Sequence, residues 1–129
     1  MRSRASAWLC LALLPLAAPI AGCSSGSTRT LPAATPVSGT LKRADGTAVG
    51  DVTLMLQPTA AGHMTALEVD GAGSFSGEVV AGPYAWFVAK SAKAKDADAA
   101  LAKVPEDFTR GSLERKVTVG SSPLALTIP

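Results

Sequence analysis

Residues 65–88, TALEVDGAGSFSGEVVAGPYAWFV, are the stretch of sequence that decides the fold class. Leu67 and Val69 alternate with other residues, and the turn signal Asp70-Gly71-Ala72-Gly73 follows them. The alternation resumes over residues 75–79, Gly82-Pro83 turns the chain again, and three large residues then share one face: Tyr84, Trp86 and Val88. A period of two between turn signals predicts three β-strands joined by short connections.

The same period of two continues on both sides of this stretch. Turn or stop signals lie at Asp45-Gly46, Pro58 and Gly120-Ser121-Ser122-Pro123. The apolar positions of four further strands are Val37, Gly39 and Leu41; Val52, Leu54 and Leu56; Val117 and Val119; and Leu124, Leu126 and Ile128. Seven short strands at regular spacing predict an all-β domain, built as an antiparallel β-sandwich.

One segment, Ser91 to Val104, has a different composition. It is rich in Ala, Lys and Asp, which favour a helix, and Pro105 would end any helix at Val104. We expect a crossover between strands that carries at most a short helix. Leu101 and Val104 would touch the sandwich, and the charged residues would face water: Lys93, Lys95, Asp96 and Asp98.

The glycines and the aspartate of the turns have structural roles in this interpretation. Gly71, Gly73 and Gly82 suit positions that need a positive φ or a close approach of two backbones. The Asp70 carboxylate can accept hydrogen bonds from backbone N–H groups of its own turn.

The aromatic residues divide between the two faces of the expected strands. Phe75, Tyr84 and Trp86 are predicted to lie in the core, where the Tyr84 hydroxyl needs a hydrogen-bond partner. Phe87 points opposite Trp86. An exposed aromatic cluster that includes Phe87 would indicate a ligand-binding surface, and a buried Phe87 would count against one.

The N-terminal residues form a different kind of segment. Arg2 and Arg4 precede an apolar run from Ala7 to Ile20, which is too short to span a bilayer as a helix. A buried apolar helix is disfavoured because two prolines, Pro15 and Pro19, interrupt the run. A basic start, a short apolar run and small residues at 21–22 predict a secretory signal.

The residues that end this segment, Ile20-Ala21-Gly22-Cys23, resemble the lipobox of bacterial lipoproteins. The resemblance implies removal of residues 1–22, diacylglyceryl attachment to the Cys23 sulfur and acylation of its new amino group, typically with palmitate. Two or more acyl chains hold a protein stably on a membrane. No acidic residue stands directly after Cys23, and by the same resemblance this favours the outer membrane over the inner one.

The composition sets the domain boundaries. Residues 23–36 comprise the lipidated Cys23 and a segment rich in Ser, Thr, Pro and Ala, which predicts a flexible tether with a reach on the order of 20 Å. Residues 37–129 then suffice for one domain with its own core.

Charge and cysteine content exclude several functions. Arg2 and Arg4 account for the formal net charge of +2, so the processed chain would be neutral and offers no evidence for nucleic-acid binding. Cys10 leaves with the signal and Cys23 carries lipid, so no disulfide or thiolate metal site is expected within one chain.

The strand and turn motifs resemble those of carboxypeptidase regulatory-like domains. The segments that carry this resemblance are Val37–Leu41, Asp45-Gly46, Val52–Pro58, Val69–Phe75 with the D-x-x-G-x-F element, Ala81–Tyr84 with G-x-Y, and Val104–Phe108 with the last two strands. The chain departs from the pattern at Pro83, at Phe108 and at Ser121-Ser122-Pro123. The resemblance implies a seven-stranded transthyretin-like, or immunoglobulin-like, sandwich that serves as an accessory module without catalytic residues.

Residues that could carry catalysis are few. His63 is the one histidine and lies in a loop-like stretch, so we expect it to be solvated. Asp96 and Asp98 alternate with lysines, which predicts a self-paired surface. The five serines of the turns lie outside any nucleophile motif: Ser74, Ser76, Ser112, Ser121 and Ser122. We expect no catalytic site, no cofactor and no metal.

Three hypotheses for the function remain at this point. The first is a lipid-anchored, non-enzymatic module of the bacterial cell envelope that has a structural role or binds another envelope protein. The second is a module that binds a small ligand or carbohydrate on the envelope. The third, an enzyme, is the weakest because the sequence offers no catalytic constellation.

Overall fold

The computed structural model of the protein describes residues 30, 32–60 and 62–129. The predicted signal segment, Cys23 and most of the predicted tether lie outside the described residues. The elements follow in the order β1 (Ala34–Arg43), β2 (Val52–Pro58), β3 (Thr65–Val69), β4 (Ser74–Val80), β5 (Gly82–Lys90), α1 (Ala97–Ala102), α2 (Glu106–Thr109), β6 (Lys116–Val119) and β7 (Leu124–Ile128).

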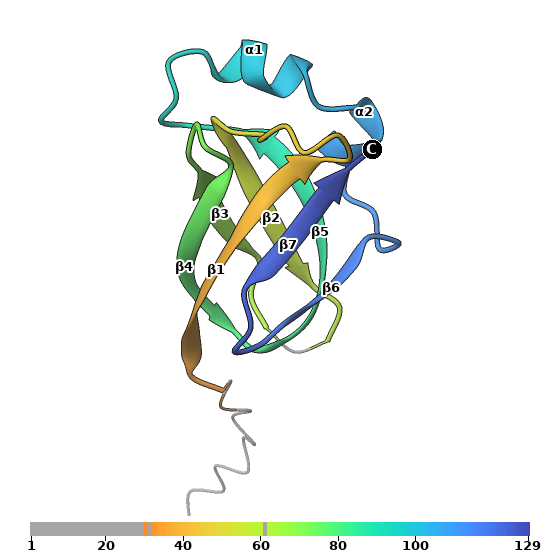
Figure 1. The fold of residues 1–129 in the computed structure, drawn as a ribbon. Helices are drawn as coiled ribbons and strands as arrows, with labels where there is room; N and C mark the ends of the chain where they lie inside the picture. Colours follow the sequence, from red (N-terminus) through yellow and green to blue (C-terminus); the bar gives the residue numbers. More distant parts are fainter. Residues whose placement is uncertain (1–29, 31, 61) are drawn as a thin grey trace, which may run out of the picture.

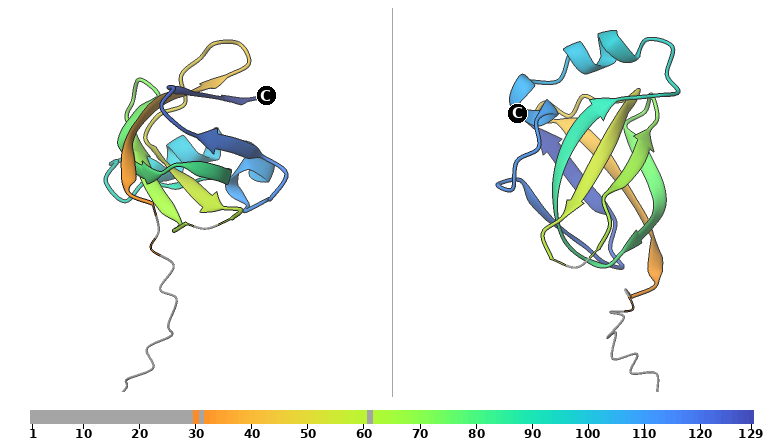
Figure 2. Two further views of the ribbon diagram at one scale, coloured as in Figure 1. Left: turned by 90° about the horizontal axis from the view of Figure 1, so that it is seen from below. Right: turned by 180° about the vertical axis from the view of Figure 1, so that it is seen from behind.

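The seven strands form one mixed sheet of order β6-β5-β2-β3-β4-β1-β7, which curls into a nearly closed barrel (Figures 1 and 2). The prediction of seven strands is confirmed. The prediction that all of them are antiparallel is wrong for one pair, because β7 runs parallel to β1, with Gly39 opposite Leu124 and Arg43 opposite Ile128. Alternation along a strand decides which face a side chain lies on, but it does not select the neighbouring strand.

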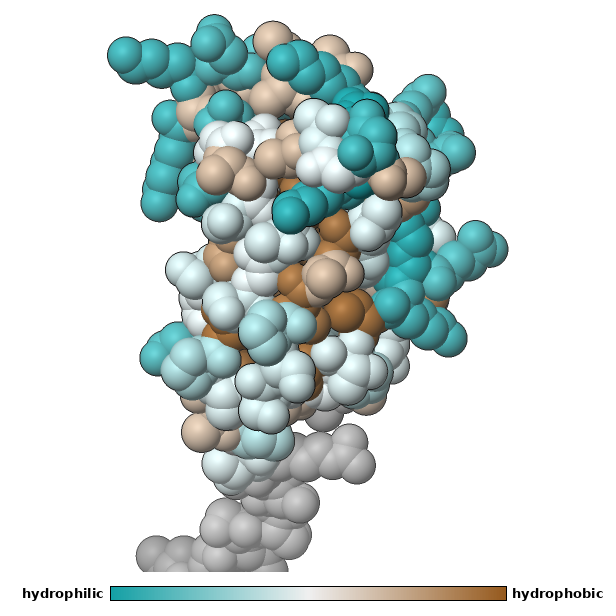
Figure 3. Space-filling model, viewed as in Figure 1, coloured by the Kyte–Doolittle hydropathy of each residue, from teal (hydrophilic) through white to brown (hydrophobic). Residues whose placement is uncertain are grey.

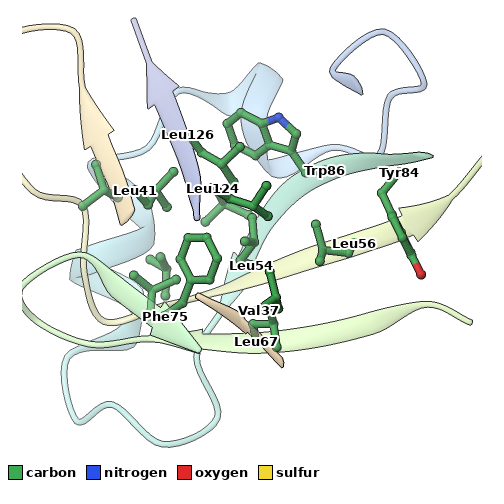
Figure 4. Close-up of a cluster of buried hydrophobic side chains, with 14 of the residues drawn as sticks. Val37, Leu41, Leu54, Leu56, Leu67, Phe75, Tyr84, Trp86, Leu124 and Leu126 are labelled. Carbon is green, nitrogen blue, oxygen red and sulfur yellow. The ribbon is translucent and has the colours of Figure 1, made fainter. Parts of the chain in front are cut away.

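The connection between β3 and β4 is the weakest link in the sheet. Val69 and Phe75 are the one pair of residues in register there. By contrast, β1 and β4 pair continuously from Ala34 opposite Val80 to Thr40 opposite Ser74. The sheet therefore consists of two parts, β6-β5-β2-β3 and β4-β1-β7, which are almost separate in their hydrogen bonding and enclose the core between them (Figure 4).

The core contains the side chains that the alternation predicts. Tyr84 is 1% exposed and Trp86 6% exposed, so the predicted register of β5 is confirmed. The Tyr84 hydroxyl donates a hydrogen bond of 2.7 Å to the carbonyl oxygen of Val80, which satisfies the one polar atom of that side chain. The fully buried aliphatic residues include Leu41, Val52, Leu54, Leu56, Val79, Val88, Val119 and Ile128.

The turn between β3 and β4 has the predicted hydrogen bonds. Asp70 Oδ1 accepts from the backbone N–H groups of Ala72 and Ser74, both at 2.9 Å. Gly73 has a φ of +78°, and a Cβ atom there would lie 2.6 Å from the carbonyl oxygen of Leu41. Both observations explain why a larger residue would distort this turn.

Gly39 on β1 also allows a close approach, here between β1 and β7. A Cβ atom on Gly39 would lie 2.3 Å from the carbonyl oxygen of Leu124 and 2.5 Å from the Phe75 ring. The missing side chain lets β7 pair with β1 while Phe75 fills the space beneath them.

The crossover between β5 and β6 contains two short helices. α1 lies inside the predicted segment, Val104 is buried and Leu101 packs partly buried against the core, as predicted. α2 was not expected, and it begins directly after Pro105, the residue predicted to end the first helix. Both helices lie across the upper end of the barrel in Figure 1, opposite the end at which β1 begins.

Candidate functional site

The two ends of the barrel are built from different segments (Figures 1 and 2). We define the tether end as the end at which β1 begins, and it consists of residues 34–36, 59–60, 62–64, 80–83 and 120–123. We define the helix end as the opposite end, which consists of residues 44–51, 70–73 and 91–109. The chain before β1 enters the barrel at the tether end, and the connections between the following strands then alternate between the two ends.

Charge is distributed unequally between these two ends. The tether end contains no Lys, Arg, Asp or Glu, and its one ionisable side chain is His63. The helix end carries Asp45, Asp51, Asp70, Lys93, Lys95, Asp96, Asp98, Lys103, Glu106 and Asp107. Figure 3 shows hydrophilic surface over the helices and on the side of the barrel, and a paler surface toward the start of β1 with one hydrophilic group at the lower left.

Arg115 holds the second helix against the barrel. Its guanidinium carbon lies 4.6 Å from the centre of the Phe108 ring, and that ring packs on the buried Trp86. The same guanidinium donates hydrogen bonds to the carbonyl oxygens of Asp107 and Arg110, at 2.5 and 2.8 Å. Its Nε also donates to the carbonyl oxygen of Trp86 on β5, at 3.4 Å, so the cation has a structural role that links α2 and the segment after it to the barrel.

A second polar cluster fixes the other end of the crossover. Glu68 on β3 accepts hydrogen bonds from the hydroxyl of Thr53, at 2.8 Å, and from that of Ser91, at 2.6 Å. The Ser91 oxygen in turn accepts from the backbone N–H groups of Lys93 and Ala94, both at 3.1 Å. Thr53 and Ser91 are buried. Both carboxylate oxygens of Glu68 are thus engaged in holding the chain where it leaves β5.

A shallow hollow lies over β1, β3 and β4. It is open, has a volume of about 580 Å³, and is lined by Ser38, Gly39, Thr40, Glu68, Asp70, Ser74, Phe75, Ser76 and Pro123. Phe75 is only 3% exposed, and the other side chains of the lining, apart from Pro123, end in hydroxyl or carboxylate groups. Sugar-binding sites that stack a ring on an aromatic face need an exposed aromatic side chain, and the hollow presents none.

Phe87 lies on the outer face of β5, as predicted, but it is only partly exposed. Its ring lies beside Gly111, where a Cβ atom would come within 3.9 Å of it. Among the described residues it is the one aromatic side chain on the outer face, because the others belong to the core or pack against it. The exposed aromatic cluster that would indicate a ligand platform is therefore not formed around Phe87.

The residues considered for catalysis lie apart from one another. His63 is exposed in the β2–β3 loop, Asp98 pairs with Lys90 at 2.7 Å, and Asp96 precedes α1 with an exposed side chain. The serines at 74, 76, 121 and 122 are exposed, and Ser112 is partly exposed. Within residues 30, 32–60 and 62–129, no group of three or more His, Cys, Asp or Glu side chains could hold a metal ion.

Two ionisable groups are shifted from their ordinary pKa values. The backbone N–H of Thr47 donates to Asp45 Oδ1 at 2.8 Å and lowers the pKa of that exposed carboxyl group. Burial raises the pKa of Tyr84, because the phenolate would lose its hydration in the core. The first shift belongs to a turn and the second to the core, so neither indicates a catalytic group.

Comparison with known proteins adds no relative to these observations. No family model matches the chain, and neither a curated protein nor a solved structure matches it. No helix in the part of the chain that the structure describes is both long and apolar enough to cross a membrane.

Proposed function

We propose that this protein is a lipid-anchored, non-enzymatic lipoprotein of the bacterial cell envelope, acting as a structural or protein-interaction module. The observation that carries the proposal is the sequence Ile20-Ala21-Gly22-Cys23 at the end of a short apolar run. Cleavage before Cys23 and its acylation would leave the barrel on a tether at the membrane surface. The absence of an acidic residue directly after Cys23 favours the outer membrane as the final location.

The arrangement of the barrel suits this role. The chain enters β1 at the tether end, and α1 and α2 lie at the opposite end. On an anchored domain of this shape the helix end is the end farther from the tether, and its charged side chains remain solvated. We therefore assign the protein-binding surface to the helix end, around the exposed residues Lys93 and Lys95.

Polar side chains with several partners support a non-enzymatic role. Glu68 accepts hydrogen bonds from two buried hydroxyl groups and Arg115 donates to backbone carbonyl groups, and both thereby hold the crossover in place. Groups engaged in this way are not free to bind or activate a substrate.

We further propose that the domain is a carboxypeptidase regulatory-like domain with a transthyretin-like or immunoglobulin-like sandwich. The Asp70 turn, with two backbone hydrogen bonds to one carboxylate oxygen, supports this assignment. So does the sheet, whose two parts are joined at the single pair Val69 and Phe75 and could act as the two layers of a sandwich.

Binding of a small ligand or carbohydrate is the alternative function. The hollow over β1, β3 and β4 would be its site. The partly buried position of Phe87 and the absence of an exposed ring in the hollow make this alternative less well supported.

Cross-linking in intact cells followed by mass spectrometry tests the proposed interaction. The full-length protein should yield a defined envelope protein as its cross-linked partner. Reversal of charge at the helix end, with Lys93→Glu and Lys95→Glu together, should remove that product. Lys42→Glu, at an exposed position on β1, is the matched control and should leave it unchanged. Equal loss with both variants, or the same product from an unrelated anchored protein, would contradict a specific surface at the helix end.

A further inference from the structure

The tether end of the barrel has the composition of a surface that can lie against lipid head groups. Its segments consist of Ala, Gly, Pro, Ser, Thr and Val with His63 and Met64. Bringing such residues to a membrane surface removes no Lys, Arg, Asp or Glu side chain from water, and burial of a charge is the costly part of such a contact. Hydroxyl groups can keep their hydrogen bonds among the head groups.

Met64 gives this end a large apolar side chain. It is 54% exposed, and among the described residues it is one of two large hydrophobic side chains that are exposed to this degree. The other, Leu113, is 59% exposed and belongs to the segment between α2 and β6, which runs along the side of the barrel. A single exposed methionine is ordinary on a protein surface, but here it lies at the end of the barrel where the charges are absent.

The negative charge of anionic lipids favours contact through the end of the barrel that carries fewer carboxylates. A bacterial membrane surface is negative and repels carboxylates within about one Debye length, roughly 8 Å at physiological salt. Most acidic residues outside the strands belong to the helix end, and the one nearest the tether end, Glu78 on β4, is exposed and pairs with Pro36. The tether end therefore brings fewer carboxylates to a negative surface than the helix end does.

Because the predicted tether would keep the barrel close to the membrane, a weak attraction between the tether end and the lipid is sufficient to orient the domain. A flexible chain from Cys23 to Ala34 would have a root-mean-square length on the order of 20 Å, and such linkers give effective concentrations in the millimolar range. β1 has 10 residues and is about 33 Å long, so the helix end would reach the membrane only with a nearly stretched tether. The tether thus selects the uncharged end.

We propose that the tether end of the barrel rests on the lipid head groups of the membrane that holds Cys23, with Met64 in contact with the lipid and α1 and α2 directed away from it. The inference rests on the proposed lipid anchor and adds a fixed orientation of the domain to it. A freely tethered domain would sample all orientations, whereas this one presents its helix end to the aqueous space.

Fluorescence quenching in vesicles tests the orientation. The full-length lipidated protein, with either Ser121→Cys at the tether end or Ala99→Cys in α1, is labelled at its single free thiol with an environment-sensitive dye. It is reconstituted in vesicles of phosphatidylethanolamine and phosphatidylglycerol that contain a lipid with a nitroxide head group. Both positions are exposed, so labelling should not disturb the fold. We expect several-fold stronger quenching at position 121 than at position 99.

Two further variants separate the role of Met64 from a general effect of added charge. Met64→Asp should reduce quenching at position 121 toward that at position 99, whereas Leu113→Asp, at a similarly exposed position, should leave it unchanged. Equal quenching at positions 121 and 99 would overturn the orientation. The orientation would also be overturned if the dye at position 121 were shielded from an aqueous quencher but not quenched by the lipid. That result would indicate that a protein covers this end of the barrel.

Flotation of the same samples on a density gradient keeps the two proposals distinguishable. If the protein floats with the vesicles and the quenching is equal at both positions, the anchor stands and the orientation is wrong. If the protein does not float, the anchor itself fails, and the orientation fails with it.

Discussion

The indole ring of Trp86 packs against the phenyl ring of Phe108, with centroids 5.6 Å apart and planes inclined by 46°. Trp86 belongs to β5 and Phe108 to α2, so this contact ties the crossover to the core. The crossover is therefore part of the packed structure and not a loop laid over it.

Truncation of Trp86 should destabilise the domain strongly. Trp86→Ala would remove a buried ring, leave a cavity and free Phe108, with an expected loss of about 3–5 kcal/mol in the free energy of unfolding. Phe87→Ala, on the partly exposed outer face of the same strand, should cost clearly less. Denaturant unfolding of both variants measures the difference, and an equal or greater loss for Phe87→Ala would show that the outer face contributes more than its exposure indicates.

Removal of the Arg115 guanidinium should loosen α2 without unfolding the barrel. Arg115→Gln loses the contact with the Phe108 ring and three hydrogen bonds to carbonyl groups, and we expect a loss of about 1–3 kcal/mol. Arg110→Gln is the matched control, because Arg110 makes an exposed ion pair with Glu106 within the same segment. Unfolding and tryptophan emission of Trp86 should change with the first variant only. A similar small effect from both would argue that the Arg115 contacts contribute little.

The hydrogen bonds of Ser91 predict a local effect on the crossover. Ser91→Ala leaves one Glu68 oxygen and the N–H groups of Lys93 and Ala94 without their partner, at an expected cost of about 1–2 kcal/mol. Hydrogen exchange at those two amides should accelerate beyond the change in global stability. Ser112→Ala, which removes a single longer bond of 3.2 Å to the Glu114 N–H, serves for comparison. Unchanged exchange at Lys93 and Ala94 would be inconsistent with the proposed role of Ser91.

The raised pKa of Tyr84 predicts how stability changes at alkaline pH. Because the folded-state pKa lies above the ordinary tyrosine value of 10.0, the stabilisation of the neutral phenol is fully present below about pH 10 and is lost as the pH rises through the folded-state pKa. Tyr84→Phe should be less stable at neutral pH, since the Val80 carbonyl loses its donor, but it should show a shallower alkaline decline. Chemical unfolding across this pH range compares the two slopes, and parallel slopes would exclude a contribution from Tyr84.

The inward faces of the strands could be predicted from the sequence, because burial imposes a period of two on each strand separately. Tyr84, Trp86 and Val88 illustrate this, and Asp70 shows that turn chemistry is equally local. The parallel pairing of β1 with β7 could not be predicted, since it depends on which strand edges meet after the sheet curls. For the same reason the partners of Glu68 and Arg115, which come from different elements, left no signal in the spacing of residues.

The contrast between the two ends of the barrel was also hidden in the sequence. The uncharged segments around residues 35, 62, 82 and 121 are far apart along the chain, and only the topology brings them to one end. A pattern of this kind becomes visible once the loops are sorted by the end of the barrel to which they belong.

The most direct measurement of the central proposal is the fate of Cys23 in growing cells. Metabolic labelling with radioactive palmitate, combined with mass spectrometry of the N-terminal peptide, should show a labelled wild-type chain that begins at an acylated Cys23. The Cys23→Ser variant should take up no label, and residues 1–22 should not be cleaved off before position 23. Its barrel should still fold. Normal labelling of the Cys23→Ser variant, or a wild-type chain without acyl groups at Cys23, would contradict the proposal of a lipid anchor.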